Sequence, residues 1–233
     1  MTHAASQRVS EDADFTALRF NMIEQQIRPW DVLDDRILET LGTLWRHHFV
    51  LPGQEKLAYA DIELPLGHSE YMLAPKVEGR LLQATAPQAH EQVLEIGTGS
   101  GYLTACLARL SAHVDSVDIE PEFRQRALLN LTREGLNDIT TLFTADAAHG
   151  WSGQRETYDV IVIGGSLPMP DMLEPFERLL NIGGRLFAVI GTEPVMEAML
   201  IRRDGENAFN RTGLFETDLK PLRGLSAPRV FHL

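Results

Sequence analysis

The sequence has a single cysteine, Cys106, among its 233 residues. One thiol excludes an intramolecular disulfide framework and a cysteine-rich metal site. Because Cys106 stands within an apolar helical stretch, we interpret it as a small core residue. Five of the histidines show no metal-ligand spacing with carboxylates, and we therefore predict no metal: His47, His48, His90, His113 and His149.

Positive charge and long apolar runs are also scarce. Lys and Arg number 21 against 33 Asp and Glu, so the net charge is −12. Nucleic acids bind to clustered cations, which makes them improbable partners. No apolar run reaches the roughly 18 to 20 residues of a membrane span. Residues 1–14 are polar, without the basic-then-apolar pattern of a signal peptide. We expect a flexible arm there and a cytoplasmic protein with no membrane contact.

Helical periodicity dominates the first third of the chain. Apolar residues at helical spacing predict a helix over residues 15–28, and Pro29 should end it and push Arg28 out of the α region. A second helix should begin after an N-cap at Asp34. One face of this second helix carries Ile37, Leu38, Leu41 and Leu44. A polar loop should then lead to a helix over residues 76–84, on which we place Lys76 and Glu78 at the surface.

Strands and helices alternate beyond residue 91. We predict strands at residues 93–96, 114–118, 140–144, 158–163 and 185–190, and helices at 102–110, 121–134 and 171–180. Such alternation implies a parallel sheet with right-handed crossovers. Residues 195–202 and 209–217 flank the turn signal Asp204-Gly205 and should form an antiparallel pair. The predicted fold is α/β, with a doubly wound, mostly parallel, Rossmann-like seven-stranded sheet over residues 86–233. Residues 15–85 should form an N-terminal helical extension with an active-site loop.

A glycine loop, Gly97-Thr98-Gly99-Ser100-Gly101, separates the first strand from its helix. Its spacing resembles dinucleotide-binding loops, but Glu95 just before it would repel a pyrophosphate. Two further acids, Asp118 and Asp146, follow the next two strands. Three acids at one sheet edge suit a nucleoside with positive charge, which indicates S-adenosylmethionine. Three solvated acids beside a tight turn are the alternative. Ser166, after the fourth strand, should lie at the mouth of this crevice.

The segment from Gly67 to Pro75 is the second candidate region. It includes His68, Ser69, Glu70 and Tyr71, and it is either an active-site wall or an ordinary solvated connection. His68 is a candidate general base for a hydroxyl or amine acceptor, and a loop histidine bonded to backbone is the alternative.

The motifs together resemble the protein-L-isoaspartate O-methyltransferase family of class I S-adenosylmethionine-dependent methyltransferases. The resemblance is carried by Met22–Arg28, by Arg46-His47-His48-Phe49-Val50, by Tyr59-Ala60-Asp61, by Leu64–His68 and by Val93–Gly101. It implies protein repair, in which the free carboxylate of an isoaspartyl residue in a protein or peptide becomes a methyl ester. It also implies a cofactor site formed by Glu95, Gly97, Thr98, Gly99, Gly101, Asp118, Ile119, Asp146, Ala147, Tyr71, Met72 and Leu73.

The chain departs from the family pattern at the candidate acceptor loop. Leu73 stands where the family has the serine assigned to catalysis, and Tyr71 stands at its threonine. Asp146-Ala147 replaces the usual Asp-Gly. His68, Ser69 and Tyr71 remain the candidate catalytic residues. Two alternatives follow: a methyltransferase redirected to another, small acceptor, or a non-catalytic cofactor-binding module. The absence of an Asn/Asp-Pro-Pro-Tyr signature disfavours an amine acceptor. The oligomeric state and any motion of the loop stay open.

Overall fold

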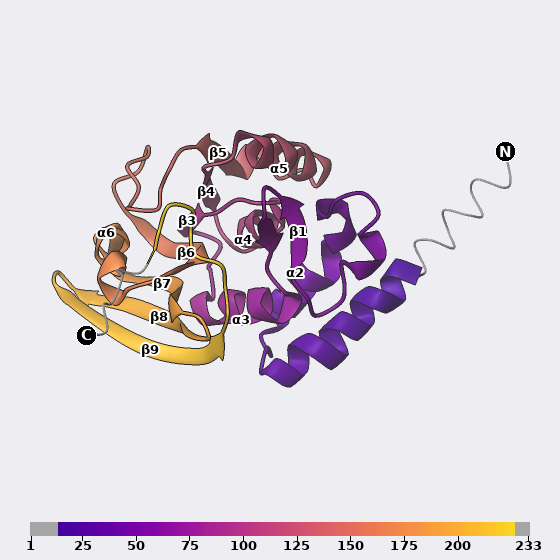
Figure 1. The fold of residues 1–233 in the computed structure, drawn as a ribbon, viewed down its shortest axis with the longest axis horizontal. Coiled ribbons are helices and arrows are strands. Elements are labelled where there is room, and N and C mark those ends of the chain that lie inside the picture. Colours follow the sequence, from indigo (N-terminus) through magenta and orange to yellow (C-terminus); the bar gives the residue numbers. More distant parts are fainter. Residues whose placement is uncertain (1–13, 227–233) are drawn as a thin grey trace, which may run out of the picture. The chain divides into compact units, whose positions relative to one another are not determined.

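The computed structural model describes residues 14–226 (Figure 1). The chain divides into two compact units, which meet in sequence between Gln83 and Ala84. Of the predicted arm, residues 1–13 lie outside the described residues, and Asp14 begins a helix. None of the helices within residues 14–226 combines the length and the apolar character needed to cross a membrane.

The first unit is mainly helical. An α-helix over residues 14–21 leads into the π-helical turn η1 (Met22–Ile27). The α-helix α2 (Asp35–Thr43) and three 3-10 helices follow, which are η2 (Arg28–Trp30), η3 (Arg46–Phe49) and η4 (Glu55–Leu57). The unit then forms strands β1 (Leu64–Gly67) and β2 (Glu70–Met72), and helix α3 (Pro75–Thr85) starts within it.

The predicted helix end at Pro29 is wrong. Arg28 stays in the α region, with φ −58° and ψ −42°, and its N–H donates to the carbonyl of Ile23, five residues back. Pro29 falls in the first turn of η2. A missing N–H costs no intrahelical bond there, and the wide π turn carries the chain into the proline without breaking the helix.

Helix α2 confirms the second predicted helix. The Asp34 carboxylate accepts a hydrogen bond from the Arg36 N–H, which is the expected N-cap. The predicted apolar face is buried, with Ile37, Leu38, Leu41 and Leu44 between 0% and 6% exposed. Helix α3 likewise confirms the helix predicted over residues 76–84.

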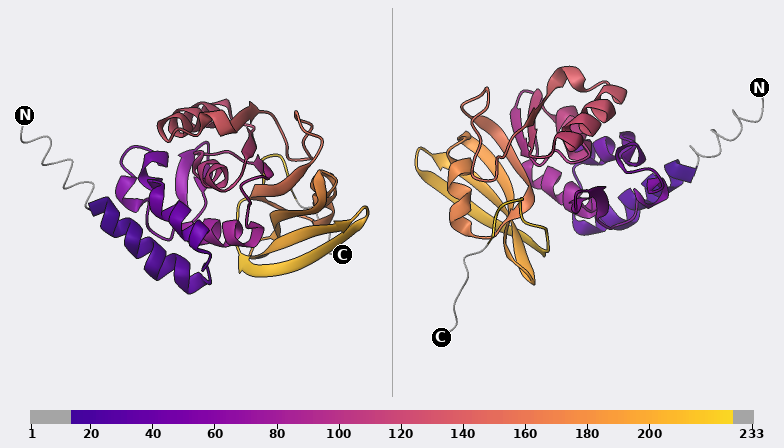
Figure 2. Two further views of the ribbon diagram at one scale, coloured as in Figure 1. Left: turned by 180° about the vertical axis from the view of Figure 1, so that it is seen from behind. Right: turned by 45° about the horizontal axis from the view of Figure 1, so that its top comes forward.

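The second unit holds the predicted sheet. Its elements are β3 (Gln92–Ile96), α4 (Tyr102–Leu110), β4 (His113–Asp118), α5 (Pro121–Arg133), η5 (Asn137–Ile139), β5 (Thr140–Thr144), β6 (Tyr158–Leu167), η6 (Pro170–Leu173), α6 (Glu174–Glu177), β7 (Leu180–Thr192), β8 (Val195–Gly205) and β9 (Ala208–Thr217). The strand order is β5-β4-β3-β6-β7-β8-β9. The first five strands are parallel, and β8 and β9 add an antiparallel hairpin at one edge, drawn orange to yellow in Figure 2. The predicted fold is confirmed.

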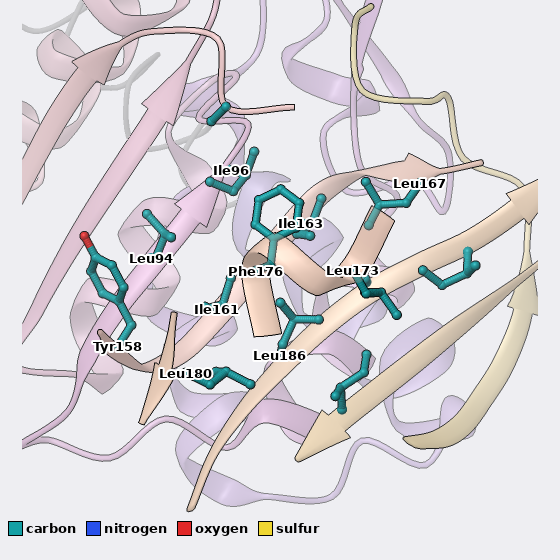
Figure 3. Packing of buried hydrophobic residues seen from close by; sticks show 14 of the residues in the cluster. Leu94, Ile96, Tyr158, Ile161, Ile163, Leu167, Leu173, Phe176, Leu180 and Leu186 are labelled. Atoms are coloured by element: carbon teal, nitrogen blue, oxygen red, sulfur yellow. The ribbon is translucent and has the colours of Figure 1, made fainter. Parts of the chain in front are cut away.

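Successive side chains of β3 point alternately to an apolar face and to a polar face of the sheet. Leu94 and Ile96 pack in an apolar cluster with Phe176 of α6 and with residues of the neighbouring strands (Figure 3). Glu95, between them, points to the other face, where its carboxylate accepts a hydrogen bond from Thr104 of α4. Both faces of β3 are therefore buried, one by apolar contacts and the other beneath a polar network.

Several predicted boundaries in this unit shift. The helix predicted over residues 171–180 is reduced to η6 and the four-residue α6, each with a proline in its first turn. Strand β7 starts five residues earlier than predicted, and its register with β6 is irregular. A Cβ at Gly184 would lie 2.9 Å from the Asn181 carbonyl oxygen, so only glycine fits this irregular start. The hairpin turn lies at Glu206-Asn207, two residues after the predicted Asp204-Gly205.

Candidate functional site

The glycine loop follows β3 with the geometry that its sequence predicts. Gly97, Gly99 and Gly101 all have positive φ, at 97°, 52° and 82°. A Cβ at Gly101 would lie 2.9 Å from the Ala127 Cβ, so the close approach of α5 requires glycine there. At Gly97 the nearest atoms to an added Cβ belong to the backbone of Gly164, at 3.7 Å. The loop therefore presents backbone with little side-chain bulk.

Asp118 is the acid most closely tied to this loop. Its Oδ2 accepts a hydrogen bond from the Gly99 N–H and its Oδ1 accepts one from the Glu120 N–H, both at 2.9 Å. Ile119 beside it is 39% exposed and offers an apolar surface at the same strand end. Asp118 therefore holds the glycine loop through Gly99 and the turn after β4 through Glu120.

Glu95 is fully buried beneath the loop. Its Oε2 accepts hydrogen bonds from the Thr104 and Ser116 hydroxyls, and the Ser116 Oγ lies 2.6 Å from the Thr98 Oγ1. The carboxylate thus supports the loop from behind through hydroxyl groups. Thr104 and Ser116 were not among the predicted site residues. The signal that marks them is a hydroxyl on the buried face of an otherwise apolar helix and strand.

The third acid lies in a more open position. Asp146 follows β5, and it is exposed, with its Oδ1 accepting a hydrogen bond from the Ala148 N–H at 3.0 Å. Ala147 is buried beside it. Because parallel strands end at one edge of a sheet, Asp146, Asp118 and the glycine loop belong to the same edge of the second unit.

Ser166 has a different role from the one that its position suggested. It is fully buried, its hydroxyl donates to the Leu219 carbonyl at 2.7 Å, and its N–H donates to the Lys220 carbonyl. The expectation that Ser166 stands at the mouth of the crevice is wrong. Its polar groups are used to hold the C-terminal segment.

The candidate acceptor loop in the first unit is a β-hairpin instead of a loop. Strands β1 and β2 pair antiparallel, and His68 and Ser69 form the turn between them. Both residues are exposed and have positive φ, at 52° and 59°, as in type I′ hairpin turns. Such turns favour asparagine and glycine. Non-glycine residues in the left-handed region store strain, and such strain concentrates at functional sites.

A substitution that relieves the backbone strain at Ser69 should stabilise the protein. We expect Ser69→Gly to raise the free energy of unfolding by about 0.5–1 kcal/mol, because glycine adopts positive φ without a steric cost and its extra freedom in the unfolded chain offsets only part of the gain. Urea denaturation measures this change. If the Ser69 hydroxyl also contacts the acceptor, the KM for the acceptor should rise in the same variant. A stabilised variant with an unchanged KM would show that the strain serves no function.

The residues after the turn pass from the surface into the interior. Tyr71 is 51% exposed, whereas Met72 and Leu73 are 4% and 8% exposed. The Leu73 carbonyl accepts a hydrogen bond from Nη2 of the fully buried Arg46. The side chain at the position of the family serine is thus packed, and its backbone is tied to a buried cation.

Arg46 also pairs with Glu78, and this corrects the prediction that Glu78 lies at the surface. Arg46 Nη1 donates to Glu78 Oε2, and the two side chains are 0% and 2% exposed. Burial raises the pKa of the Glu78 carboxyl to about 7, although the Arg46 guanidinium opposes the shift. Lys76, predicted at the surface with Glu78, is 28% exposed and pairs with Asp61. Glu78 is drawn inside by a partner that lies 32 residues away in sequence.

Metal ligands do not gather in the part of the chain that the structure describes. Within residues 14–226, no group of three or more His, Cys, Asp or Glu side chains could hold a metal ion. His113, one of the histidines considered above, instead lies 3.2 Å from the Asp115 carboxylate and 2.9 Å from the Thr141 hydroxyl.

Comparison with known proteins gives a consistent result along the chain. The family model of protein-L-isoaspartate(D-aspartate) O-methyltransferase matches residues 19–224. A protein-L-isoaspartate O-methyltransferase of Methanoculleus marisnigri is 35% identical over 188 residues, which are 80% of this chain and 84% of the relative. One of Aeropyrum pernix is 34% identical over 217 residues, covering 91% and 82% of the two chains.

Solved structures show the same fold. A Plasmodium falciparum protein assigned to the protein-L-isoaspartate O-methyltransferases, in complex with S-adenosyl-L-homocysteine, superposes with a TM-score of 0.72 at 19% identity. The match covers 90% of this chain and 98% of that one. A second protein-L-isoaspartate O-methyltransferase structure gives a TM-score of 0.74 at 21% identity, over 89% of this chain and 65% of the other.

Proposed function

Because the chain belongs to the protein-L-isoaspartate(D-aspartate) O-methyltransferase family and is an S-adenosylmethionine-dependent methyltransferase, we propose that it esterifies the carboxylate of a damaged aspartyl residue in a protein or peptide. When bound, the cofactor supplies a methyl group on a positively charged sulfur atom. Relatives that carry the isoaspartyl name match most of the chain. They favour this acceptor over the redirected one.

The second unit, which begins at Ala84, is proposed to bind the cofactor. The proposed contacts are Glu95, Gly97, Thr98, Gly99, Gly101, Asp118, Ile119, Asp146 and Ala147. These residues fit a cationic nucleoside, because the glycine loop is accompanied by one buried carboxylate, Glu95, and two acids after strand ends, Asp118 and Asp146. The observation that carries the proposal is the pair of hydrogen bonds from the Gly99 and Glu120 N–H groups to Asp118. They hold a carboxylate beside the glycine loop, at the carboxyl edge of the sheet where open α/β folds bind their ligands.

The first unit is proposed to carry the acceptor side through the candidate catalytic residues His68, Ser69 and Tyr71. A carboxylate acceptor is already ionised at neutral pH, so the chain need not remove a proton from it. Its task is alignment of the acceptor oxygen with the methyl group, together with exclusion of water. The Leu73 side chain has no hydrogen-bond donor. We therefore assign orientation of the acceptor to the exposed groups of the turn, the Ser69 and Tyr71 hydroxyls and the His68 ring.

A paired assay tests this function. Calorimetry should show micromolar binding of S-adenosylmethionine, and a peptide with one isoaspartyl residue should become a methyl ester that later releases methanol. The same peptide with a normal aspartyl residue is the control and should stay unmodified. Cofactor binding with methylation of neither peptide, but of another acceptor, would contradict the proposed acceptor. Absence of cofactor binding would contradict the family-level activity.

The substitution Leu73→Ser tests the importance of the missing hydroxyl. We expect kcat on the isoaspartyl peptide to rise by up to about 10²-fold, because the serine hydroxyl can orient the acceptor carboxylate, and a misplacement of the reacting atoms by about 1 Å can cost that much in rate. We also expect a loss of about 1–3 kcal/mol in stability, because a packed leucine is replaced by a smaller polar group. Steady-state kinetics and urea denaturation measure the two effects. Leu73→Ala is the matched control, since it removes the same packing without adding a hydroxyl.

A further inference from the structure

The segment after β9 turns back onto the sheet. We call residues 219–225 the C-terminal strap; it follows β9 in the yellow part of the chain in Figure 1. Ser166 at the end of β6 holds it by three hydrogen bonds. The Ser166 hydroxyl donates to the Leu219 carbonyl at 2.7 Å, the Ser166 N–H donates to the Lys220 carbonyl at 2.9 Å, and the Leu222 N–H donates to the Ser166 carbonyl at 3.0 Å.

Close packing fixes the strap at the same place. A Cβ at Gly165 would lie 2.8 Å from Leu222 Cδ2 and 3.1 Å from the Leu222 N, so the strap leaves no room for a side chain there. Leu222 and Leu225 pack against the apolar cluster of the sheet. The strap is therefore anchored by backbone bonds and apolar contacts on the β6 side.

From β6 the strap reaches across to β4. Arg223 Nη1 lies 2.8 Å from Oε2 of Glu120, which is two residues beyond the end of β4. Strand β3 lies between β6 and β4 in the sheet, and the glycine loop leaves its end. The Arg223 side chain therefore links the strap on β6 to the turn after β4, on the two sides of the strand from which the glycine loop emerges.

The same ion pair is connected to Asp118. The Glu120 carboxylate is held by Arg223, and the Glu120 N–H donates to Asp118 Oδ1 at 2.9 Å. The chain of contacts thus runs from the strap, through Glu120, to the carboxylate that shapes the glycine loop. The side chains of Arg223 and Glu120 are 38% and 16% exposed, so their attraction is partly screened by salt.

We propose that Arg223 is a positioning residue for the cofactor site, which through Glu120 holds the strap over the carboxyl edge of the sheet and fixes the turn that presents Asp118. This inference rests on the proposed cofactor assignment of that edge. It adds that the C-terminal segment, far from the glycine loop in sequence, limits cofactor release. Because the pair is partly exposed, its effect should be moderate and should decrease with salt.

The test compares Arg223→Ala, Arg223→Lys and Arg178→Ala in the full-length protein. Arg178 forms an exposed ion pair with Glu174 on α6 and is the matched control. We expect Arg223→Ala to weaken binding of S-adenosyl-L-homocysteine about three- to fivefold, chiefly through faster dissociation, as fits a loss of up to about 1 kcal/mol. Arg223→Lys, which keeps the charge, should restore most of the affinity. High salt should weaken binding to the wild type but hardly to Arg223→Ala.

Amide hydrogen exchange supplies a readout without cofactor. The Leu222 N–H should exchange several-fold faster in Arg223→Ala than in the wild type, while a melting temperature within about 2 °C of the wild type would show that the fold is intact. Unchanged Leu222 exchange, or an affinity loss in Arg178→Ala equal to that in Arg223→Ala, would overturn the proposal. A wild-type protein that binds no S-adenosyl-L-homocysteine would instead contradict the cofactor assignment. The exchange experiment would still decide whether the ion pair between Arg223 and Glu120 holds the strap in place.

Discussion

Replacing Glu78 with alanine is expected to lower the free energy of unfolding by about 3–5 kcal/mol, because the substitution leaves the guanidinium of Arg46 buried without its carboxylate. Arg46 is 0% exposed and donates to both Glu78 and the Leu73 carbonyl. The loss should therefore also loosen the backbone after the hairpin. Urea denaturation at pH 8 measures the stability, and the KM for an isoaspartyl peptide reports on the hairpin.

The double substitution Arg46→Met with Glu78→Leu is the control. Buried ion pairs replaced by apolar groups of similar volume often cost little, because both desolvation penalties disappear together. We expect the double variant to be more stable than Glu78→Ala. A double variant as unstable as the single one would show that packing, and not the unpaired charge, causes the loss.

The same carboxyl should make stability depend on pH. Burial raises the pKa of Glu78 from 4.5 to about 7 in the folded state. Between these values the folded chain binds more protons than the unfolded one, so the stability that comes from protonation of Glu78 is fully present below about pH 4.5 and is lost as the pH rises toward 7. The difference in unfolding free energy between the wild type and Glu78→Gln, which cannot titrate, should fall over this range by up to about 1.4 kcal/mol per pH unit. A difference that rises with pH would mean that the attraction to Arg46 exceeds the cost of burial.

Replacing Asp118 with alanine is expected to weaken S-adenosylmethionine binding by about 1.5–3 kcal/mol, or roughly 10- to 150-fold in Kd. Two effects combine in this change. The ligand loses a charged acceptor for its hydroxyls, and the Gly99 and Glu120 N–H groups lose the acceptor that holds the loop. Calorimetry with the full-length protein measures the affinity, and a Kd that stays within twofold of the wild type would contradict the proposed site.

Asp118→Asn separates these two effects. Asparagine keeps one oxygen acceptor but offers donors in place of the other, so it should retain part of the loop geometry and lose most of the charge-assisted bonding. We expect its affinity to lie between those of the wild type and Asp118→Ala. Faster hydrogen exchange of the Gly99 N–H in the alanine variant alone would show that the loop, as well as the ligand contact, depends on this carboxylate.

The hairpin of β1 and β2 was only partly predictable from the local sequence pattern. Pro65, Gly67 and Pro75 excluded a helix there, and the hairpin is consistent with that exclusion. The pattern did not predict β1 and β2, because their strands are only four and three residues long and the turn residues His68 and Ser69 are not the usual ones. Because residues such as His68 and Ser69 rarely adopt positive φ, the surrounding structure must hold the turn in this conformation.

The sequence by itself determined the alternation of strands and helices, the place of the glycine loop and the acids at three strand ends. These features depend on side-chain period and on glycine φ preferences, which act within a few residues. Only the tertiary structure decided that Glu78 is buried with Arg46, that Ser116 supports Glu95 beneath the loop, and that Arg223 reaches Glu120. Each of these pairs joins residues at least 21 positions apart, and the balance of burial cost against a partner's charge exists only once packing has brought the partner close.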